Sequence, residues 1–120
     1  MSPTTQLPIE SIGEFADRLP ASGTQDVTIE VINDDIGDQI QVRRLPWHAL
    51  IYDQKEKVLE LSVGARGREM EIIFRHEIHN PTRIWVEEDA GVVRSMNIEH
   101  EDGTKTIVQF FERDALETGS

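Results

Sequence analysis

The histidines in the second half of the chain are the residues best suited to chemistry. His76 and His79 lie three positions apart, and His100 stands between two glutamates. Imidazole and carboxylate groups both bind divalent metal ions, and imidazole also exchanges protons near neutral pH. One interpretation of the sequence is therefore a metal-binding or small-molecule-binding β-barrel, catalytic or not, with these residues at its mouth: His76, His79, His100 and Glu99.

The spacing of these histidines argues against a shared metal. The segment around them alternates apolar and polar residues, which is typical of a β-strand. On a strand, residues three apart point to opposite faces, so His76 and His79 are expected to diverge. His76 shares its face with Ile72 and Phe74. The favoured interpretation is a histidine held by hydrogen bonds in the core or at its rim, without a metal.

Other catalytic groups are scarce in this sequence. The chain has no cysteine, which excludes disulfides, thiolate metal sites and thiol nucleophiles. It has no Gly-x-Ser-x-Gly motif, and no glycine-rich loop opens a helix after a strand. We therefore expect no cofactor and favour a function other than catalysis.

A second group of residues could contact a partner protein. Tryptophan and arginine supply many of the energetically dominant contacts at protein interfaces. Arg43, Trp47 and His48 lie close together in the sequence, and Trp85 is the second tryptophan. The other interpretation of Trp47, which follows a proline, is ordinary packing in the core.

The charge of the chain excludes several classes of partner. The 120 residues include 23 acidic and 12 basic side chains, which gives a formal net charge of -11. An acidic surface repels phosphate, so neither nucleic acid nor an anionic membrane is an expected partner. An acidic protein that mimics nucleic acid would need its charges spaced like the phosphates of a duplex. The acidic residues of this chain are spread evenly over both halves, which does not favour this function. No secretion signal or membrane-spanning run is recognisable, and a cytoplasmic location is expected.

The N-terminal part predicts one amphipathic helix. Apolar residues recur at spacings of three and four over residues 9–19, with charged residues between them. Pro8 is tolerated in a first helical turn, and Pro20 favours an extended Leu19. The helix should present one apolar stripe to a core.

From residue 25 onward the apolar period becomes two, which predicts a series of β-strands. The strands are expected at 27–31, 40–42, 47–52, 59–63, 70–78, 84–86, 92–101 and 104–111. Leu45-Pro46 should interrupt pairing and place an edge or a corner there. Asp102-Gly103 predicts a hairpin, and a two-residue loop would put Ile98 opposite Ile107. In that register each face of the hairpin carries both apolar and polar residues. We therefore expect either a bulge that reverses the inward face partway along, or different elements covering the two ends of the hairpin.

These elements predict an α+β domain over residues 8–113. Its N-terminal helix packs on a bent antiparallel sheet of about seven strands, which is either open or closed into a small barrel. Residues 1–7 and 114–120 are expected to be flexible termini. A chain of this length can bury one core without disulfides.

Three motifs resemble those of a known family. They are Leu45-Pro46, the run HEIHNPTRIWV from His76 to Val86, and the turn Asp102-Gly103-Thr104. Together they are similar to a family of small acidic bacterial proteins that is known as a domain of unknown function. The resemblance covers about residues 9–111 and implies one intact domain, without assigning an activity or a ligand.

The sequence therefore favours a small cytoplasmic accessory or protein-interaction domain that is not an enzyme. Its partner would be another protein or a second copy of the chain, bound through a sheet edge or the two tryptophan regions. The metal-binding or small-molecule-binding alternative predicts that the histidines converge on one site.

Overall fold

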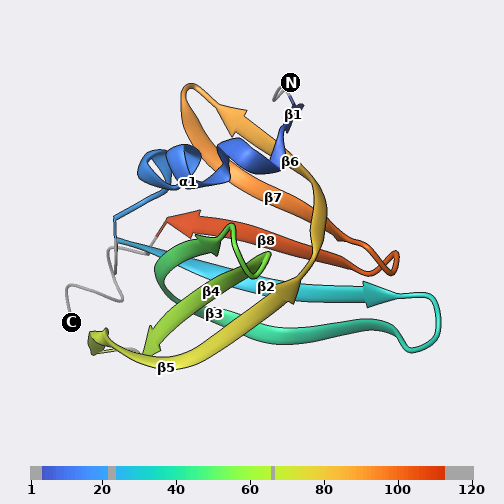
Figure 1. The fold of residues 1–120 in the computed structure, drawn as a ribbon. Helices are drawn as coiled ribbons and strands as arrows, with labels where there is room; N and C mark the ends of the chain where they lie inside the picture. The colour runs from blue at the N-terminus through green and yellow to red at the C-terminus, as the bar shows by residue number, and fades with distance from the viewer. Residues whose placement is uncertain (1–3, 22–23, 66, 113–120) are drawn as a thin grey trace.

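Eight antiparallel strands make up most of residues 4–21, 24–65 and 67–112, which a computed structural model describes. They are β1 (Thr4–Leu7), β2 (Gln25–Asn33), β3 (Gly37–Asp53), β4 (Val58–Ala65), β5 (Arg68–His79), β6 (Pro81–Asp89), β7 (Val92–His100) and β8 (Lys105–Glu112). Their order in the sheet is β1-β6-β7-β8-β2-β3-β4-β5 (Figure 1). The two end strands, β1 and β5, do not pair with each other in the part described. The sheet is therefore open, and the closed barrel considered above is not formed.

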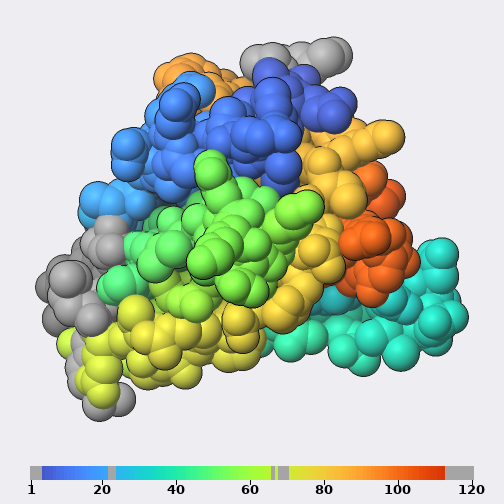
Figure 2. Space-filling view, in the orientation of Figure 1, coloured from blue at the N-terminus to red at the C-terminus, as the bar shows by residue number. Residues whose placement is uncertain are grey.

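The predicted helix is shorter and less regular than its apolar stripe suggests. It consists of the 3-10 turn η1 (Ile9–Ser11), the single α-helical turn α1 (Ile12–Phe15) and the 3-10 turn η2 (Ala16–Arg18). Pro20 holds Leu19 in an extended conformation, as expected, which ends the helical segment. Ile12 and Phe15 are buried, so the stripe does face the core. The segment packs against β3 and β6 (blue in Figure 2).

The first corner of the sheet lies in β3. The strand pairs with β2 up to Pro46 and with β4 from Trp47 onward, so it changes partner at this point. Arg44 has a φ of 53°, which turns the chain just before the change. The predicted corner is present, but the predicted interruption of the strand is wrong. Proline is tolerated because it stands where one ladder ends and the next begins.

The second corner joins β5 to β6. Asn80 has a φ of 53°, a left-handed conformation that asparagine adopts more readily than most residues. Its backbone N–H donates to the Lys57 carbonyl at 2.8 Å, and its carbonyl accepts from the Glu101 N–H at 3.0 Å. The two corners fold β4 and β5 over β2 and β8 (Figure 1). Apolar residues from both halves, such as Leu61 and Val108, form one buried core.

The hairpin between β7 and β8 has a different register from the one predicted. Ile98 lies opposite Thr106, and Asn97 lies opposite Ile107. The Gly103 N–H donates to the His100 carbonyl, and the His100 N–H donates to the Thr104 carbonyl. The loop therefore has three residues, ending in a glycine at positive φ, rather than two. This shift by one residue puts Met96, Ile98, Thr106 and Val108 on one buried face. The expected bulge lies further along β7, where Arg94 is the extra residue between Ser95 and Val93, which lie opposite Glu87 and Glu88.

A side chain at Gly103 should destabilise this loop by a measurable amount. Gly103 has a φ of +90°, and a Cβ there would meet no atom within 4 Å. Gly103→Ala should therefore lower the free energy of unfolding by about 1 kcal/mol through backbone strain alone. Urea denaturation measures this loss. The matched control is Gly13→Ala in α1, where a Cβ also meets nothing and alanine should leave stability unchanged or raise it.

The N-terminal residues extend the sheet. Thr4–Leu7 pair with Ile84–Glu87 as an edge strand, whereas residues 1–7 were predicted to be a flexible terminus. The free edge of β6 offers hydrogen-bond partners to this short extended segment. The predicted C-terminal segment 114–120 lies outside the described residues. None of the helices in the described part of the chain has the length and apolar character of a membrane span.

Candidate functional site

Two of the predicted histidines meet at one buried hydroxyl. His100 Nε2 lies 2.8 Å from Thr106 Oγ1, and His76 Nε2 lies 3.5 Å from the same oxygen. Thr106 is 0% exposed, and both histidines are half-buried. A hydroxyl can donate one hydrogen bond and accept another, so it can link two neutral imidazoles of opposite tautomer. This link connects β5 with the β7–β8 hairpin.

The surroundings favour the neutral form of both histidines. Burial lowers the pKa of His76, and the nearby His100 lowers it further. Burial also lowers the pKa of His100; Asp102 opposes this effect and His79 adds to it. Asp102 itself has a lowered pKa, chiefly because the Thr104 N–H donates a hydrogen bond to its carboxylate. The histidine pair therefore carries little charge at neutral pH.

The predicted metal ligands do not converge. His79 is exposed, on the face of β5 opposite to His76, as the alternation of a strand requires. Glu99 points to the face of the sheet away from His100, where it lies opposite Lys105. In residues 4–21, 24–65 and 67–112, no group of three or more histidine, aspartate or glutamate residues is placed to hold a metal ion. The metal-binding alternative gains no support from this arrangement.

The residues predicted to form a protein-binding patch also lie apart. Trp47 is 1% exposed, and its ring packs edge-on against Phe110 at 5.2 Å. His48 is half-buried, with Nδ1 3.3 Å from Ser62 Oγ, while Arg43 is exposed. Trp85 belongs to β6, on the other half of the sheet. The predicted patch is therefore wrong for Trp47, whose other interpretation, packing in the core, is the one that its burial supports.

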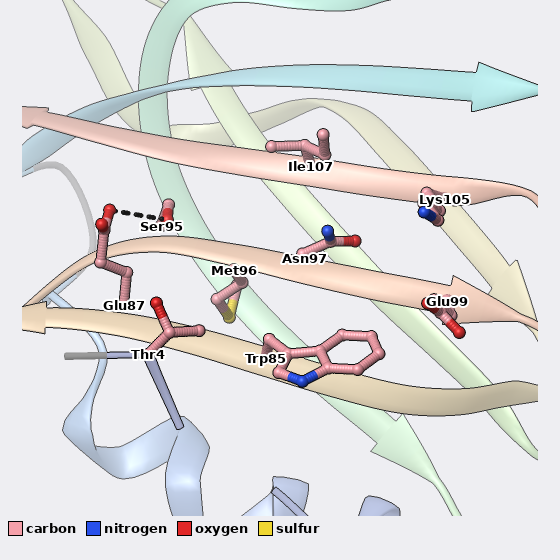
Figure 3. Close-up of a pocket in the computed structure, with 9 residues that line it drawn as sticks. All are labelled: Thr4, Trp85, Glu87, Ser95, Met96, Asn97, Glu99, Lys105 and Ile107. Atoms are coloured by element: carbon pink, nitrogen blue, oxygen red, sulfur yellow. Dashed lines mark hydrogen bonds between the residues drawn. The ribbon is translucent and has the colours of Figure 1, made fainter. Parts of the chain in front are cut away.

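Trp85 lines a groove on the outer face of the sheet, opposite to the core. The groove has a volume of about 440 Å³, a size typical of ligand-binding pockets. It crosses four neighbouring strands, β1, β6, β7 and β8 (Figure 3). The lining residues are Thr4, Trp85, Glu87, Ser95, Met96, Asn97, Glu99, Lys105 and Ile107.

The strand register places the middle of the groove. Trp85 lies opposite Asn97 on β7, and Asn97 lies opposite Ile107 on β8. Cross-strand neighbours on one face contact one another, so these three side chains form one row. Side chains two residues apart on a strand lie on the same face. Glu87, two residues after Trp85 on β6, therefore lies at one end of the groove, and Glu99, two residues after Asn97 on β7, lies at the other (Figure 3).

An unsatisfied acceptor lies in this row. The side-chain oxygen of Asn97 is buried and has no hydrogen-bond partner among the residues that the structure describes. A buried acceptor without a partner typically costs about 1–3 kcal/mol. Such groups are rare in folded proteins, and a ligand that donates a hydrogen bond is one way to satisfy them.

The two ends of the groove differ in charge. At one end the Glu87 carboxylate accepts a hydrogen bond from Ser95 Oγ at 3.3 Å. At the other end Glu99 lies opposite Lys105, whose ammonium opposes its charge. The groove therefore offers an indole ring, an amide oxygen and a carboxylate, a set that suits a positively charged donor of hydrogen bonds.

Of these groove residues, sequence reasoning selected Trp85 and Glu99 and missed Asn97, Glu87 and Ile107. The signal was present in β7, where Ser95, Asn97 and Glu99 alternate with buried residues. The assumed two-residue loop placed Asn97 opposite Val108 instead of Ile107. With that register no coherent outer row could be recognised.

The chain is thus a mostly antiparallel β protein with one short helix and an outer-face groove. It belongs to a family of unknown function, DUF5335, whose model matches residues 4–119, and this confirms the resemblance noted above. An uncharacterized protein of Aquifex aeolicus (strain VF5) is 31% identical over 107 residues, covering 88% of this chain and 90% of that protein. No solved structure matches the chain.

Proposed function

We propose that this protein is a non-enzymatic interaction module of the cytoplasm that binds a basic segment of a partner protein across its outer face. The observation that carries the proposal is the groove around Trp85, with a carboxylate at each end. A tryptophan surrounded by polar groups is a frequent anchor of protein interfaces.

Charge favours a basic partner over a second copy of the chain. The net charge of -11 attracts a positively charged segment over long distances and speeds its association. Two copies of this acidic chain repel each other, and phosphate groups are repelled in the same way. The absence of cysteine is compatible with a reducing compartment.

The half-open shape of the groove suits a flexible segment. Its volume matches one or two large side chains, not a folded surface. Its four strands, β1, β6, β7 and β8, are joined by antiparallel ladders, with one bulge beside Glu87, so the lining residues are positioned before a partner arrives. A preorganised site of this kind loses less entropy on binding than a mobile loop.

We expect a fluorescent lysine- and arginine-rich peptide to bind the full chain, with an affinity that falls as salt is added. The double variant Glu87→Gln/Glu99→Gln should bind about tenfold more weakly, because each lost charge contact contributes up to about 1 kcal/mol. Fluorescence anisotropy measures both effects.

The matched control removes two charges elsewhere. Glu56 lies on the β3–β4 turn and Glu77 on β5, and both are exposed. Glu56→Gln/Glu77→Gln changes the net charge equally and should alter the affinity by less than about twofold. An equal loss in both double variants would show general attraction without a groove site and would contradict the proposal.

A further inference from the structure

We infer that the groove recognises one arginine side chain of the partner, with its guanidinium group held against Trp85 and Asn97. This inference rests on the proposed function and names the group that anchors the basic segment. It is carried by the chemistry of Trp85 and Asn97, which lie opposite each other on β6 and β7, and of Glu87 at one end of the groove (Figure 3).

The indole of Trp85 supplies the first contact. A guanidinium group is planar and weakly hydrated, so it stacks on an aromatic face more readily than an ammonium group. The same chain already uses this contact elsewhere: the Arg44 guanidinium carbon lies 4.2 Å from the centre of the Phe111 ring. Trp85 is half-buried on β6, which pairs with β1 on one side and with β7 on the other.

The Asn97 side chain supplies the second contact. Its oxygen is an acceptor that finds no partner in the described part of the chain, and a guanidinium group carries five N–H donors in a fixed plane. The oxygen is shielded in the free protein, so the inference requires the amide to turn about its terminal torsion, which is soft in asparagine, for the oxygen to face the groove. Asn97 lies opposite Trp85, so a ring-stacked guanidinium can donate to it from the same position.

Glu87 supplies the counter-charge. It lies two residues from Trp85 on the same face of β6, at the end of the groove away from Lys105 (Figure 3). Its carboxylate already accepts from Ser95 Oγ and has lone pairs left for a second donor. A planar cation with five N–H donors can stack on Trp85 and donate to Asn97 while it lies in the field of the Glu87 carboxylate, whereas an ammonium offers three donors on a point charge and no flat face.

The test compares three peptides that differ at one residue. Each peptide is nine residues long. Its central residue is arginine, lysine or citrulline, two other positions are lysine, and the remaining positions are glycine or serine. Citrulline keeps a planar group with three of the five N–H donors and loses the charge, whereas lysine keeps the charge and loses the planar group. Calorimetric titration of the full chain should give about fivefold weaker binding for lysine and at least about tenfold weaker binding for citrulline.

Two variants separate anchoring from a structural role. Trp85→Leu keeps an apolar side chain without the aromatic face, and Asn97→Leu removes the acceptor. Both should reduce the ratio of arginine to lysine affinity to about one, while Trp47→Phe in the core should leave that ratio unchanged. A merely structural effect would weaken both peptides equally and preserve the ratio.

The outcomes distinguish this inference from the proposed function. Equal binding of the arginine and lysine peptides to the unmodified protein would overturn the arginine anchor and leave the basic partner in place. A ratio that persists in Trp85→Leu would also overturn it. Failure of every basic peptide to bind at low salt would overturn the proposed function and the anchor with it.

Discussion

Replacing Trp47 by alanine is expected to lower the free energy of unfolding by about 3–5 kcal/mol, the usual range for deleting a large buried aromatic ring. Trp47 is 1% exposed and stands at the corner where β3 changes partner. Its ring meets Phe110 at 75°, so the substitution also removes an edge-to-face aromatic contact. Guanidinium chloride denaturation followed by circular dichroism measures the loss.

Trp85 provides the comparison for this substitution. It is half-buried on the outer face, and Trp85→Ala should cost on the order of 1 kcal/mol through lost cross-strand contacts. Trp47→Phe keeps most of the buried volume and serves if Trp47→Ala does not fold. Equal losses for Trp47→Ala and Trp85→Ala would contradict the assignment of one tryptophan to the core and the other to the groove.

Acidification below about pH 6.5 is expected to destabilise the protein through the histidine pair. Both histidines have a folded pKa below the ordinary value of 6.5, chiefly because burial disfavours the charged imidazolium. The unfolded chain then binds more protons than the folded chain as the pH falls through 6.5. The stability contributed by this pair is thus complete above pH 6.5 and is lost below it. Each unit by which a pKa is lowered corresponds to about 1.4 kcal/mol.

The groups that face His76 and His100 are consistent with these two histidines as the source of the pH dependence. Leu61 of β4 lies opposite His76, and Thr106 of β8 lies between the two rings. Asp102 and His79 act on His100 from the turn and from β5, while Glu99 and Lys105 face the groove. Asp102 has a lowered pKa and stays ionised at pH 5.5, so it does not titrate in this range.

Urea denaturation at pH 7.5, 6.5 and 5.5 checks this prediction. The unmodified chain should lose stability between pH 6.5 and 5.5, and His76→Gln/His100→Gln should lose less over the same interval. His79→Gln removes an exposed imidazole and should retain most of the loss. If the double variant showed the same pH dependence as the unmodified chain, the pair would not be its source.

The fold was predictable to the extent that each residue's local pattern determined it. The period of two located the strands after residue 25, and Pro20 and Pro46 marked the end of the helix and the corner. The register of the β7–β8 hairpin was not predictable, because Asp-Gly occurs in loops of two and of three residues. Strand β1 was missed because four residues without apolar alternation carry no strand signal, and it forms only when β6 offers an edge.

The candidate site was less predictable than the fold. Alternation correctly separated His76 from His79, but it could not bring His76 on β5 close to His100 on β7, because that contact depends on both corners. The pattern around Trp47 left two interpretations open, core packing and a partner contact, and no pattern placed Trp85 outside. Their neighbours are similarly mixed, and the distinction comes from which face each strand turns toward the core after its bends.

The most direct test of the groove as the binding site is a nuclear magnetic resonance titration of the full chain with the arginine peptide. The chain has two tryptophans, so two indole N–H signals report on the core and on the groove separately. We expect saturable shifts of the Trp85 indole and the Asn97 amide, with the Trp47 indole unmoved. Saturable binding that left Trp85 and Asn97 unchanged would contradict the account.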